Sequence, residues 1–480
     1  MKEQPLRYRE HIGDSKPLVE EFISSFKADR PIAKSIVIVH AAHLIGLYKE
    51  KMIPSSVASK IAKELLLVLE NPEQVYNWSK RVGCTFEDFF EALESYLHYR
   101  LGEIAGYLYL GRSRNDFISA ALRLAAREYS VDLLDKLLRL RNILLDKGEK
   151  QSGKLFPYFT HLQLAQIGSA AHYFIAFEEA LSKIWSSIFD ATLRHCYDNP
   201  LGSGPAVGTT VLLSNEVVSK LLCFEVQVAP YYATGSRLFI LDLLASLLSL
   251  FMEFSRFAND IITVNTLIPG FIESPREHVA TSSIMPHKQN LVSLELIRAK
   301  CGKAIGWLSS AFSILKGLTY GYNLDFQELN ILLVKAFREA IEVTKVFEDY
   351  IANINVVDEV LREWVRDKIF WSSELAEELA KKLNISFREA YYKVAKALRD
   401  DGWRLGENTK KLLKIVGIRT DNLFDIISRR PWEKRVLSHI RYKREKLASD
   451  VERLDSLQKR LQECKATLIR ELRRLAGEGF

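Results

Sequence analysis

The sequence has few of the residues that interrupt helices and few of the patterns that mark strands. Glycine and proline account for 23 and 13 of the 480 residues, and apolar and polar residues seldom alternate over the length of a strand. Apolar residues instead recur at intervals of three and four along most of the chain. The predicted fold class is therefore all-α.

Cysteine is also scarce, and its spacing excludes two kinds of site. The five cysteines are scattered and form no CxxC pair, which argues against a disulfide framework and a zinc site and for a reducing cytosol. The first ten residues, MKEQPLRYRE, lack the apolar core of a secretory signal. The most apolar stretch, Leu238–Phe251, is short for a membrane span and contains Asp242, so it is expected to be a buried helix. A cytoplasmic protein with no membrane partner is predicted.

No long block of like charge is present. Lysine and arginine exceed aspartate and glutamate by 67 to 60, and this net charge of +7 is spread over the whole chain. Such a balance is compatible with small acidic substrates and gives no reason to expect nucleic acid as a partner. The basic helical pattern from Glu433 onward is interpreted as a solvated or oligomer-packing helix rather than a nucleic-acid arm.

Long helical patterns occupy the middle of the sequence. They run over residues 117–150, 160–197, 238–267, 294–315 and 334–351. From Leu294 to Leu315 the apolar residues follow a 3-4-4-3-4-3 spacing, which is typical of helices packed in a bundle. Shorter helical patterns flank this region, so we expect three domains, over residues 1–109, 110–353 and 354–480.

Polar motifs gather at the joints between these helical patterns. They are LGRSRND (110–116), YFTHLQLAQ (158–166), NPLGSGPAVGT (199–209), TSSIMPHKQN (281–290) and YGYNLDFQE (320–328). The N–H groups at a helix start have no partner within the helix and favour anions. The joints are therefore the expected places for chemistry.

The second of these motifs has the spacing of a helix capping box. Thr160 would bond the third helical amide and Gln163 would bond back to the cap, which accounts for both residues but not for His161. At a helix start, His161 would lie beside free N–H groups that attract a carboxylate. A purely structural histidine is the alternative interpretation.

Two further joints each have a structural and a functional interpretation. In GRSRND, Asn115 or Asp116 could be the N-cap of the following helix, while Arg112 and Arg114 could bind a carboxylate or form surface ion pairs. The loop PLGSGPAVGT could be a tight glycine turn or a nest of amides for an anion. The sequence leaves these alternatives open.

The motif TSSIMPHKQN combines groups that suit proton abstraction next to a carboxylate. Lys288 and Asn290 could hold the carboxylate while Ser282 or Ser283 faces the reacting carbon. A serine hydroxyl acts as a base only after losing its own proton, which requires amide donors, a nearby cation and exclusion of water. A loop that closes over the substrate would supply these conditions.

Glu295, on the helical pattern that follows, needs a partner from elsewhere. It shares a face with Ala299, Gly302 and Gly306, whose small size would let another helix approach. His161 is the candidate partner, since a glutamate would fix its tautomer and stabilise its imidazolium form. No metal or cofactor motif accompanies these residues.

In this order, GRSRND, THLQLAQ, PLGSG, SSIMPHKQN with SLELIRAK, and KGLTYGYNLDFQE resemble the argininosuccinate lyase family of the fumarase/aspartase superfamily, over about residues 22–398. The resemblance implies a three-domain, mainly helical protomer whose central helices form the core of a homotetramer, with active sites built from three subunits. It also implies a reaction without a cofactor or metal, the reversible cleavage of argininosuccinate to arginine and fumarate in arginine biosynthesis.

The resemblance further implies a role for each matching residue. Ser282 matches the serine that removes the proton, Lys288 matches a residue that stabilises the resulting aci-carboxylate, and His161 paired with Glu295 matches an acid or relay. Asn290 shares the stabilising role of Lys288. The matching substrate contacts are Ser25, Arg114, Asn115, Thr160, Asn290, Tyr322 and Gln327, and His43 matches a histidine of the family's Ala-His segment.

Several positions depart from the family pattern. Thr281 replaces a glycine and is expected to stiffen the serine loop. The other departures include Phe90, Tyr109, Leu110, Phe117, Gly235, Leu238, Leu291, Leu324 and Asn330. Two alternatives therefore stand beside argininosuccinate cleavage: a lyase that releases fumarate from another amine or amide adduct, and a non-catalytic structural or binding protein on the same scaffold.

Overall fold

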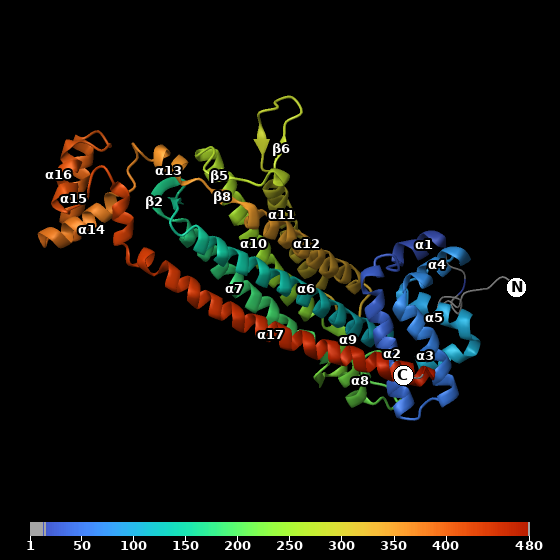
Figure 1. Ribbon diagram of the computed structural model, residues 1–480. Coiled ribbons are helices and arrows are strands. Elements are labelled where there is room, and N and C mark those ends of the chain that lie inside the picture. The colour runs from blue at the N-terminus through green and yellow to red at the C-terminus, as the bar shows by residue number, and fades with distance from the viewer. Residues whose placement is uncertain (1–12, 14–15, 479–480) are drawn as a thin grey trace.

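The structure is a computed structural model that describes residues 13 and 16–478, so the charged start MKEQPLRYRE lies outside the described residues. The described chain is elongated and almost entirely helical (Figure 1). Long helices run side by side along its length, a smaller group of helices lies at each end, and one hairpin arm projects from the side. The all-α prediction is confirmed.

The central bundle consists of five long helices. They are α6 (Arg114–Lys150), α7 (Ala170–His195), α10 (Leu238–Leu267), α11 (Val292–Leu315) and α12 (Phe326–Asn353). Helix α6 packs on α7 and α12, and α10 packs on α7 and α11. Three buried aromatic rings, Phe177, Phe254 and Phe347, join α7, α10 and α12 in the core. The 37 residues of α6 span about 55 Å at 1.5 Å per residue.

Shorter helices form the two ends, with 3₁₀ helices labelled η. At one end lie α1 (Pro17–Ile23), η2 (Arg30–Ile32), α2 (Ala33–Lys49), α3 (Ser55–Glu70), α4 (Glu73–Val82), α5 (Phe89–Leu101) and η3 (Gly102–Tyr109). At the other lie α13 (Asp358–Trp364), α14 (Ser372–Leu383), α15 (Phe387–Asp400), α16 (Glu407–Ile415) and η5 (Leu423–Arg429). The connecting helices are α8 (Asn215–Leu222), α9 (Pro230–Gly235) and η4 (Arg276–His278). The division at residues 109 and 353 stays a prediction.

The strands are short and pair two by two. β1 (Leu155–Thr160) and β2 (Gln163–Ser169) are antiparallel, with Leu155 opposite Ser169 and Thr160 opposite Gln163. β6 (Ala280–Thr281) and β7 (Gln289–Asn290) are also antiparallel and form the base of the projecting arm. The two remaining pairs are parallel β3 (Asp198–Asn199) with β4 (Val226–Gln227), and antiparallel β5 (Ile272–Glu273) with β8 (Asn355–Val356).

The predicted helix start at Thr160 is wrong. Thr160 and Gln163 face each other across the β1–β2 hairpin, so they do not form a capping box, and α7 begins only at Ala170. His161 and Leu162 make the two-residue turn with φ angles of 53° and 59°, the left-handed values that a tight hairpin turn requires. The aromatic residues of LFPYF favour a strand, and the hairpin satisfies their backbone groups.

Neither of the two candidates for the N-cap of α6, Asn115 and Asp116, is the cap. The cap is Ser113, whose side chain accepts a hydrogen bond from the Asn115 amide, and Asp116 returns a bond to the Ser113 amide as the third helical residue. Asp116 is therefore part of a capping box, and Asn115 lies within the first turn.

Two segments are long and apolar enough to cross a membrane by length and composition alone, namely Arg30–Lys49 and α10. In this fold both pack against other helices of the chain. The apolar window is 78% buried in the first segment and 50% buried in α10. Leu238 is exposed and Phe251 buried, so the stretch between them is a helix with one covered face.

The C-terminal helix α17 (Pro431–Ala476) runs along the whole bundle, from the end of β2 to α3 (Figure 1). It contains the predicted basic helical pattern and packs on its own chain. A buried ion network anchors its middle: Arg141 of α6 donates to Glu178 of α7 and to Asp450 of α17, each at 2.9 Å. Arg141 also donates to Ser182 at 3.0 Å, and Lys443 lies 3.5 Å from Glu178.

Removing the central cation of this network should be costly. Arg141→Leu leaves Glu178 and Asp450 buried with one cation fewer, and we expect a loss of about 3–5 kcal/mol in the free energy of unfolding. Arg139→Leu is the matched control, since Arg139 is exposed and pairs with Asp135 at the surface, and it should cost less than about 1 kcal/mol. Urea denaturation measures both, and equal losses would show that the network is not an anchor.

Candidate active site

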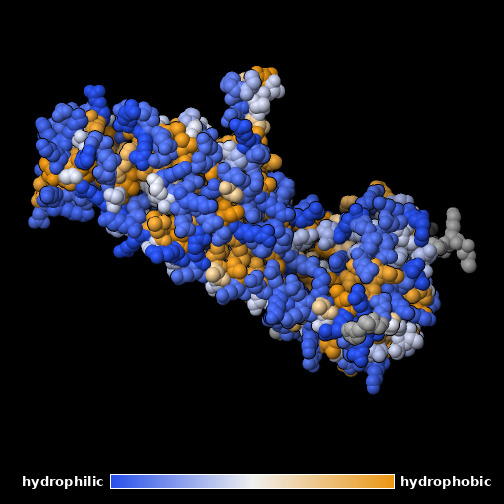
Figure 2. All heavy atoms as spheres, viewed as in Figure 1, coloured by the Kyte–Doolittle hydropathy of each residue, from blue (hydrophilic) through white to orange (hydrophobic). Residues whose placement is uncertain are grey.

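Ser282 lies on the projecting arm between β6 and β7. Its Oγ accepts hydrogen bonds from the backbone amides of Ile284 at 3.3 Å and Met285 at 3.2 Å. These are amide donors of the kind that would stabilise a serine alkoxide. The arm stands away from the body, its apolar tip is visible in Figure 2, and Ile284 at that tip is 82% exposed. Ser282 is therefore half-buried on an arm that the described part of its own chain leaves largely exposed.

The other residues of the arm lie around this serine. The hydroxyl of Thr281 donates to the carbonyl of Pro286 at 3.1 Å, a bond across the base of the loop that a glycine could not make. The Lys288 amide donates to the Met285 carbonyl at 3.0 Å, and the Lys288 side chain is exposed. Asn290 belongs to β7 and pairs with Ala280.

His161 lies at the tip of the β1–β2 hairpin, over a cavity of about 630 Å³ between the hairpin, α7 and α10. Tyr173 and Asp260 also line this cavity. Burial raises the pKa of both groups. Glu295 is exposed in the first turn of α11, and no hydrogen bond or ion pair joins it to His161 among the described residues. One chain does not bring the predicted pair together.

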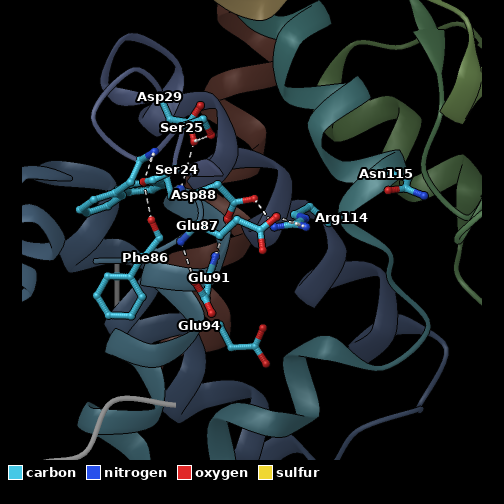
Figure 3. A network of polar contacts seen from close by, with 12 residues as sticks. Ser24, Ser25, Asp29, Phe86, Glu87, Asp88, Glu91, Glu94, Arg114 and Asn115 are labelled. Atoms are coloured by element: carbon cyan, nitrogen blue, oxygen red, sulfur yellow. Dashed lines mark hydrogen bonds and ion pairs between the residues drawn. The ribbon is translucent and has the colours of Figure 1, made fainter. Parts of the chain in front are cut away.

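A second cluster lies at the opposite end of the bundle (Figure 3). Arg114 donates to Asp88 and to Glu87, each at 2.7 Å, and points away from Asn115. The Ser25 hydroxyl donates to Asp29 at 3.0 Å. Arg114 thus forms ion pairs with carboxylates of its own chain in this structure.

Arg112 is in the same position, since it pairs with Glu94 at 2.6 Å. Of the two interpretations left open for these arginines, the structure shows ion pairing for both. Their pairing with carboxylates also means that any substrate carboxylate would have to compete for Arg114.

Two pKa shifts connect the members of this cluster. Burial raises the pKa of Asp29 to about 7, with a contribution from Asp88, against the hydrogen bonds from the Phe89 amide and Ser25. Burial also raises the pKa of Tyr322, while Arg114 and Arg237 act in the opposite direction. Ser25 is thus connected to Arg114 through Asp29 and Asp88, and Tyr322 interacts electrostatically with Arg114. Gln327 is half-buried in the first turn of α12, just after the loop that contains Tyr322.

The glycine-rich loop after β3 packs against the start of α6. Asn115 donates to the Pro205 carbonyl at 3.1 Å, and the Gly204 amide donates to Asp116 at 2.9 Å. Gly204 has a φ of 57°, and a Cβ there would lie 2.6 Å from Thr209. The loop is therefore a tight glycine turn, and its Gly204 amide is used by the carboxylate of Asp116.

Three of the departures from the family pattern meet around one buried histidine. The ring of His40 lies 5.7 Å from Phe90, 6.3 Å from Tyr109 and 5.0 Å from Phe117. Burial lowers the pKa of His40 well below its ordinary value and that of His43 to about 4, so both are neutral. Phe90, Tyr109 and Phe117 make this end of the site more apolar than the polar residues of the family pattern would at the same positions.

Two residues at this end were not predicted as site residues. Arg237 is buried over the ring of Phe326 at 4.4 Å, and its Nε and Nη2 have no hydrogen-bond partner among the described residues. Gly235 is required for space, because a Cβ there would lie 1.8 Å from the Tyr320 carbonyl. The sequence marked Gly235 only as a departure from the family pattern, and the tertiary contact shows why a glycine is required there.

The two groups of candidate residues lie at opposite ends of the helical bundle. Arg114 is the first residue of α6, and β1, which leads to His161, begins shortly after the last residue of α6. The helix between them spans about 55 Å. A single small substrate therefore cannot contact both Arg114 and His161 of the same chain.

Three comparisons with known proteins agree with this architecture. A family model described as "Lyase" matches residues 13–306. The argininosuccinate lyase of Sulfurisphaera tokodaii is 36% identical over 388 residues, which cover 81% of this chain and 83% of that protein. The argininosuccinate lyase of Pyrococcus furiosus is 35% identical over 401 residues, covering 84% and 85%. A solved EDDS lyase in complex with formate matches with a TM-score of 0.80 over 93% of this chain and 92% of that one, at 20% identity, which shows the fold alone.

The raised pKa of Asp29 predicts a pH-dependent stability. Since this pKa is 3.8 in the unfolded chain and about 7 in the fold, the folded state binds more protons between these values, and its stability should fall as pH rises through that window. Asp29→Asn should flatten this fall, whereas Asp132→Asn, at an exposed pair, should not. Urea denaturation from about pH 4.5 to 7.5 tests this, and an unchanged slope in Asp29→Asn would refute the assignment.

Proposed function

The chain belongs to the lyase family whose model it matches, and from this membership we propose that it is a carbon–nitrogen lyase that cleaves argininosuccinate reversibly into arginine and fumarate. This reaction is a step of arginine biosynthesis. The observation that carries the substrate is the identity of 34–36% with argininosuccinate lyases over more than four-fifths of the chain. The observation that carries the chemistry is the pair of amides that hold the Ser282 oxygen.

Ser282, as its alkoxide, removes the proton from the carbon next to a succinyl carboxylate. The electron pair moves into that carboxylate, where Lys288 and Asn290 offset the charge of the aci-carboxylate. The pair then forms the carbon–carbon double bond of fumarate while the carbon–nitrogen bond breaks. The leaving guanidino nitrogen takes a proton from the acid or relay formed by His161 and Glu295.

The remaining proposed residues bind the substrate, a small molecule. They are Ser25, Arg114, Asn115, Thr160, Tyr322 and Gln327. Ser25 and Arg114 are supported by the polar cluster to which both belong (Figure 3), and Tyr322 by its electrostatic interaction with Arg114. Arg114 releases Asp88 or Glu87 when a substrate carboxylate arrives, because its two terminal nitrogens are both engaged in ion pairs.

The proposed assembly is a homotetramer with shared active sites in the cytoplasm, built from protomers of three domains. The separation of His161 from Arg114 by the length of α6 supports sharing. So do the exposed apolar side chains of α11, since Ile305 and Phe312 on one side of the helix are 52% and 53% exposed and Leu296 on another side is 57% exposed. Near them, Gly302 and Gly306 have no atom within 4 Å of an added Cβ, which leaves room for a helix of another copy.

A second candidate function keeps the chemistry and changes the substrate to another fumarate-releasing amine or amide adduct. The specific observations are Leu324 and Asn330 at positions where the family pattern has lysine, and a Leu238 that is 47% exposed. A non-catalytic role on the same scaffold is the third candidate, which the joint presence of Ser282, Lys288 and Asn290 disfavours.

Purified protein mixed with argininosuccinate should release fumarate, followed by its ultraviolet absorbance. Ser282→Ala should lower turnover by at least about 100-fold, since it removes the base, and Lys288→Ala should act in the same direction by exposing the developing charge. Ser283→Ala is the matched control on the same arm and should keep most of the activity. Size-exclusion chromatography should show unchanged assembly in all three.

The substrates distinguish the three candidates. Fumarate from adenylosuccinate or aspartate, but none from argininosuccinate, would select the second. No release from any adduct, by a correctly assembled protein, would leave the non-catalytic role.

Sharing of the site between chains predicts rescue by mixing. His161→Asn and Asn115→Asp should each be inactive, because each damages one of the two ends. Dissociated and reassembled together in equal amounts, they should recover about a quarter of wild-type activity, the fraction of sites with both ends intact. No recovery in verified mixed assemblies would mean that each site is formed by one chain.

A further inference from the structure

A cavity of about 450 Å³ lies where α17 packs on α3 and α8. Its walls come from five helices, namely α2, α3, α6, α8 and α17. This volume falls within the range of small-molecule sites, about 300–1,000 Å³. Among the described residues that line the cavity, none is proposed for the lyase reaction, so the cavity is a separate place on the protomer.

The inner wall of the cavity is apolar. Each of the five helices contributes an aliphatic side chain, and these are Ile38, Leu66, Leu124, Leu221 and Leu468. The four leucines are buried and Ile38 is half-buried. Contact with such a wall removes the apolar surface of a ligand from water, so the wall favours an alkyl or aryl group as the part of the ligand that enters.

One lining residue, Arg127 of α6, is a buried cation whose hydrogen bonds go to backbone carbonyls. The residue is 6% exposed, and its terminal nitrogens donate to the carbonyl of Cys223 at 3.0 Å and to that of Leu222 at 2.8 Å. Its Cζ atom lies 4.9 Å from the ring centre of Tyr197. The Nε atom has no hydrogen-bond partner among the described residues. Because an unsatisfied buried N–H is costly and arginine suits carboxylates, Arg127 favours an anionic ligand.

The exposed charged side chains that line the cavity are mainly basic. They are Lys34, Lys465 and Arg473, against the acidic Glu70 and Glu128. Arg473 also lies 3.9 Å from Glu478. With Arg127, the lining has four cations and two carboxylates, a formal charge of +2 that attracts an anion. A single buried N–H without a partner suits one carboxylate rather than a polyanion.

We propose that this cavity binds a monocarboxylate with an apolar body, in the simplest case a medium-chain fatty acid. The carboxylate accepts a hydrogen bond from Nε of Arg127, the alkyl chain packs on the buried leucines, and the exposed lysines attract the anion from solvent. Since the walls belong to α17 and to four other helices, the ligand joins α17 to the rest of the protomer and stabilises the folded chain.

Isothermal titration calorimetry of the full-length protein tests the two parts of the ligand. Decanoate should bind with a dissociation constant of about 0.1 mM. Acetate, the head group alone, should bind at least about 10-fold more weakly because it leaves the apolar wall unused. Decyltrimethylammonium carries the opposite charge on the same alkyl chain and should also bind at least about 10-fold more weakly, since it cannot accept a hydrogen bond from Arg127. Equal affinity for either comparison compound, or no binding of decanoate, would overturn the proposal.

Two variants test whether decanoate binds in this cavity. Arg127→Met removes the buried donor, and Leu461→Trp places a larger side chain among the lining residues, so each should weaken binding at least about 10-fold. Leu461→Trp keeps the hydrogen bonds of Arg127 to the carbonyls and therefore tests the cavity even where Arg127→Met fails to fold. Lys459→Gln, at an exposed residue of α17 outside the lining, is the control and should bind like the wild type. Circular dichroism verifies folding, and wild-type affinity in either folded cavity variant would refute the proposal.

Discussion

The rigid length of α6 is the constraint on which the rest of the structure depends. Because a helix of 37 residues extends about 55 Å, it holds the arginine motif at its first turn far from the hairpin that follows its last turn. The long helices that pack side by side with it keep this separation. Each polar motif is therefore built and supported locally, by a capping box, a two-residue turn or a glycine loop, and in the proposed shared site it is completed by groups from another chain.

Buried charge is compensated inside the protomer wherever the chain can supply a partner. Arg141 is satisfied by Glu178 and Asp450, and Arg114 by Asp88 and Glu87. Arg123, Arg127 and Arg237 are exceptions among the described residues, since backbone carbonyl oxygens and aromatic rings contact these buried arginines and none of them forms an ion pair with a carboxylate. The network of Arg141 fixes α17 to the bundle, whereas in the proposed function the ion pairs of Arg114 hold a binding group in place until a substrate carboxylate arrives.

Most of the fold was predictable, because the apolar residues of long helices recur at regular intervals of three and four in the sequence. The helix predicted over residues 238–267 is α10 to the residue, and the other long patterns differ mainly at their ends. The prediction of a helix start at Thr160 was wrong for a physical reason. Residues 160–163 fit either a capping box or a two-residue turn, and the aromatic strand before them favours the turn. Of the site, single motifs were identifiable, but the occupation of Arg114 by Asp88 was not, because the two residues are far apart in sequence.

The sequence by itself determined the fold class, the family and the order of the motifs, since periodicity and local residue types act over a few positions. The tertiary structure alone decided which groups meet. It placed two amides on Ser282, gathered Phe90, Tyr109 and Phe117 around a neutral His40, and left His161 and Glu295 apart. The physical reason is that these contacts depend on how rigid helices cross, and a crossing is set by the packing of whole helix faces rather than by any short stretch.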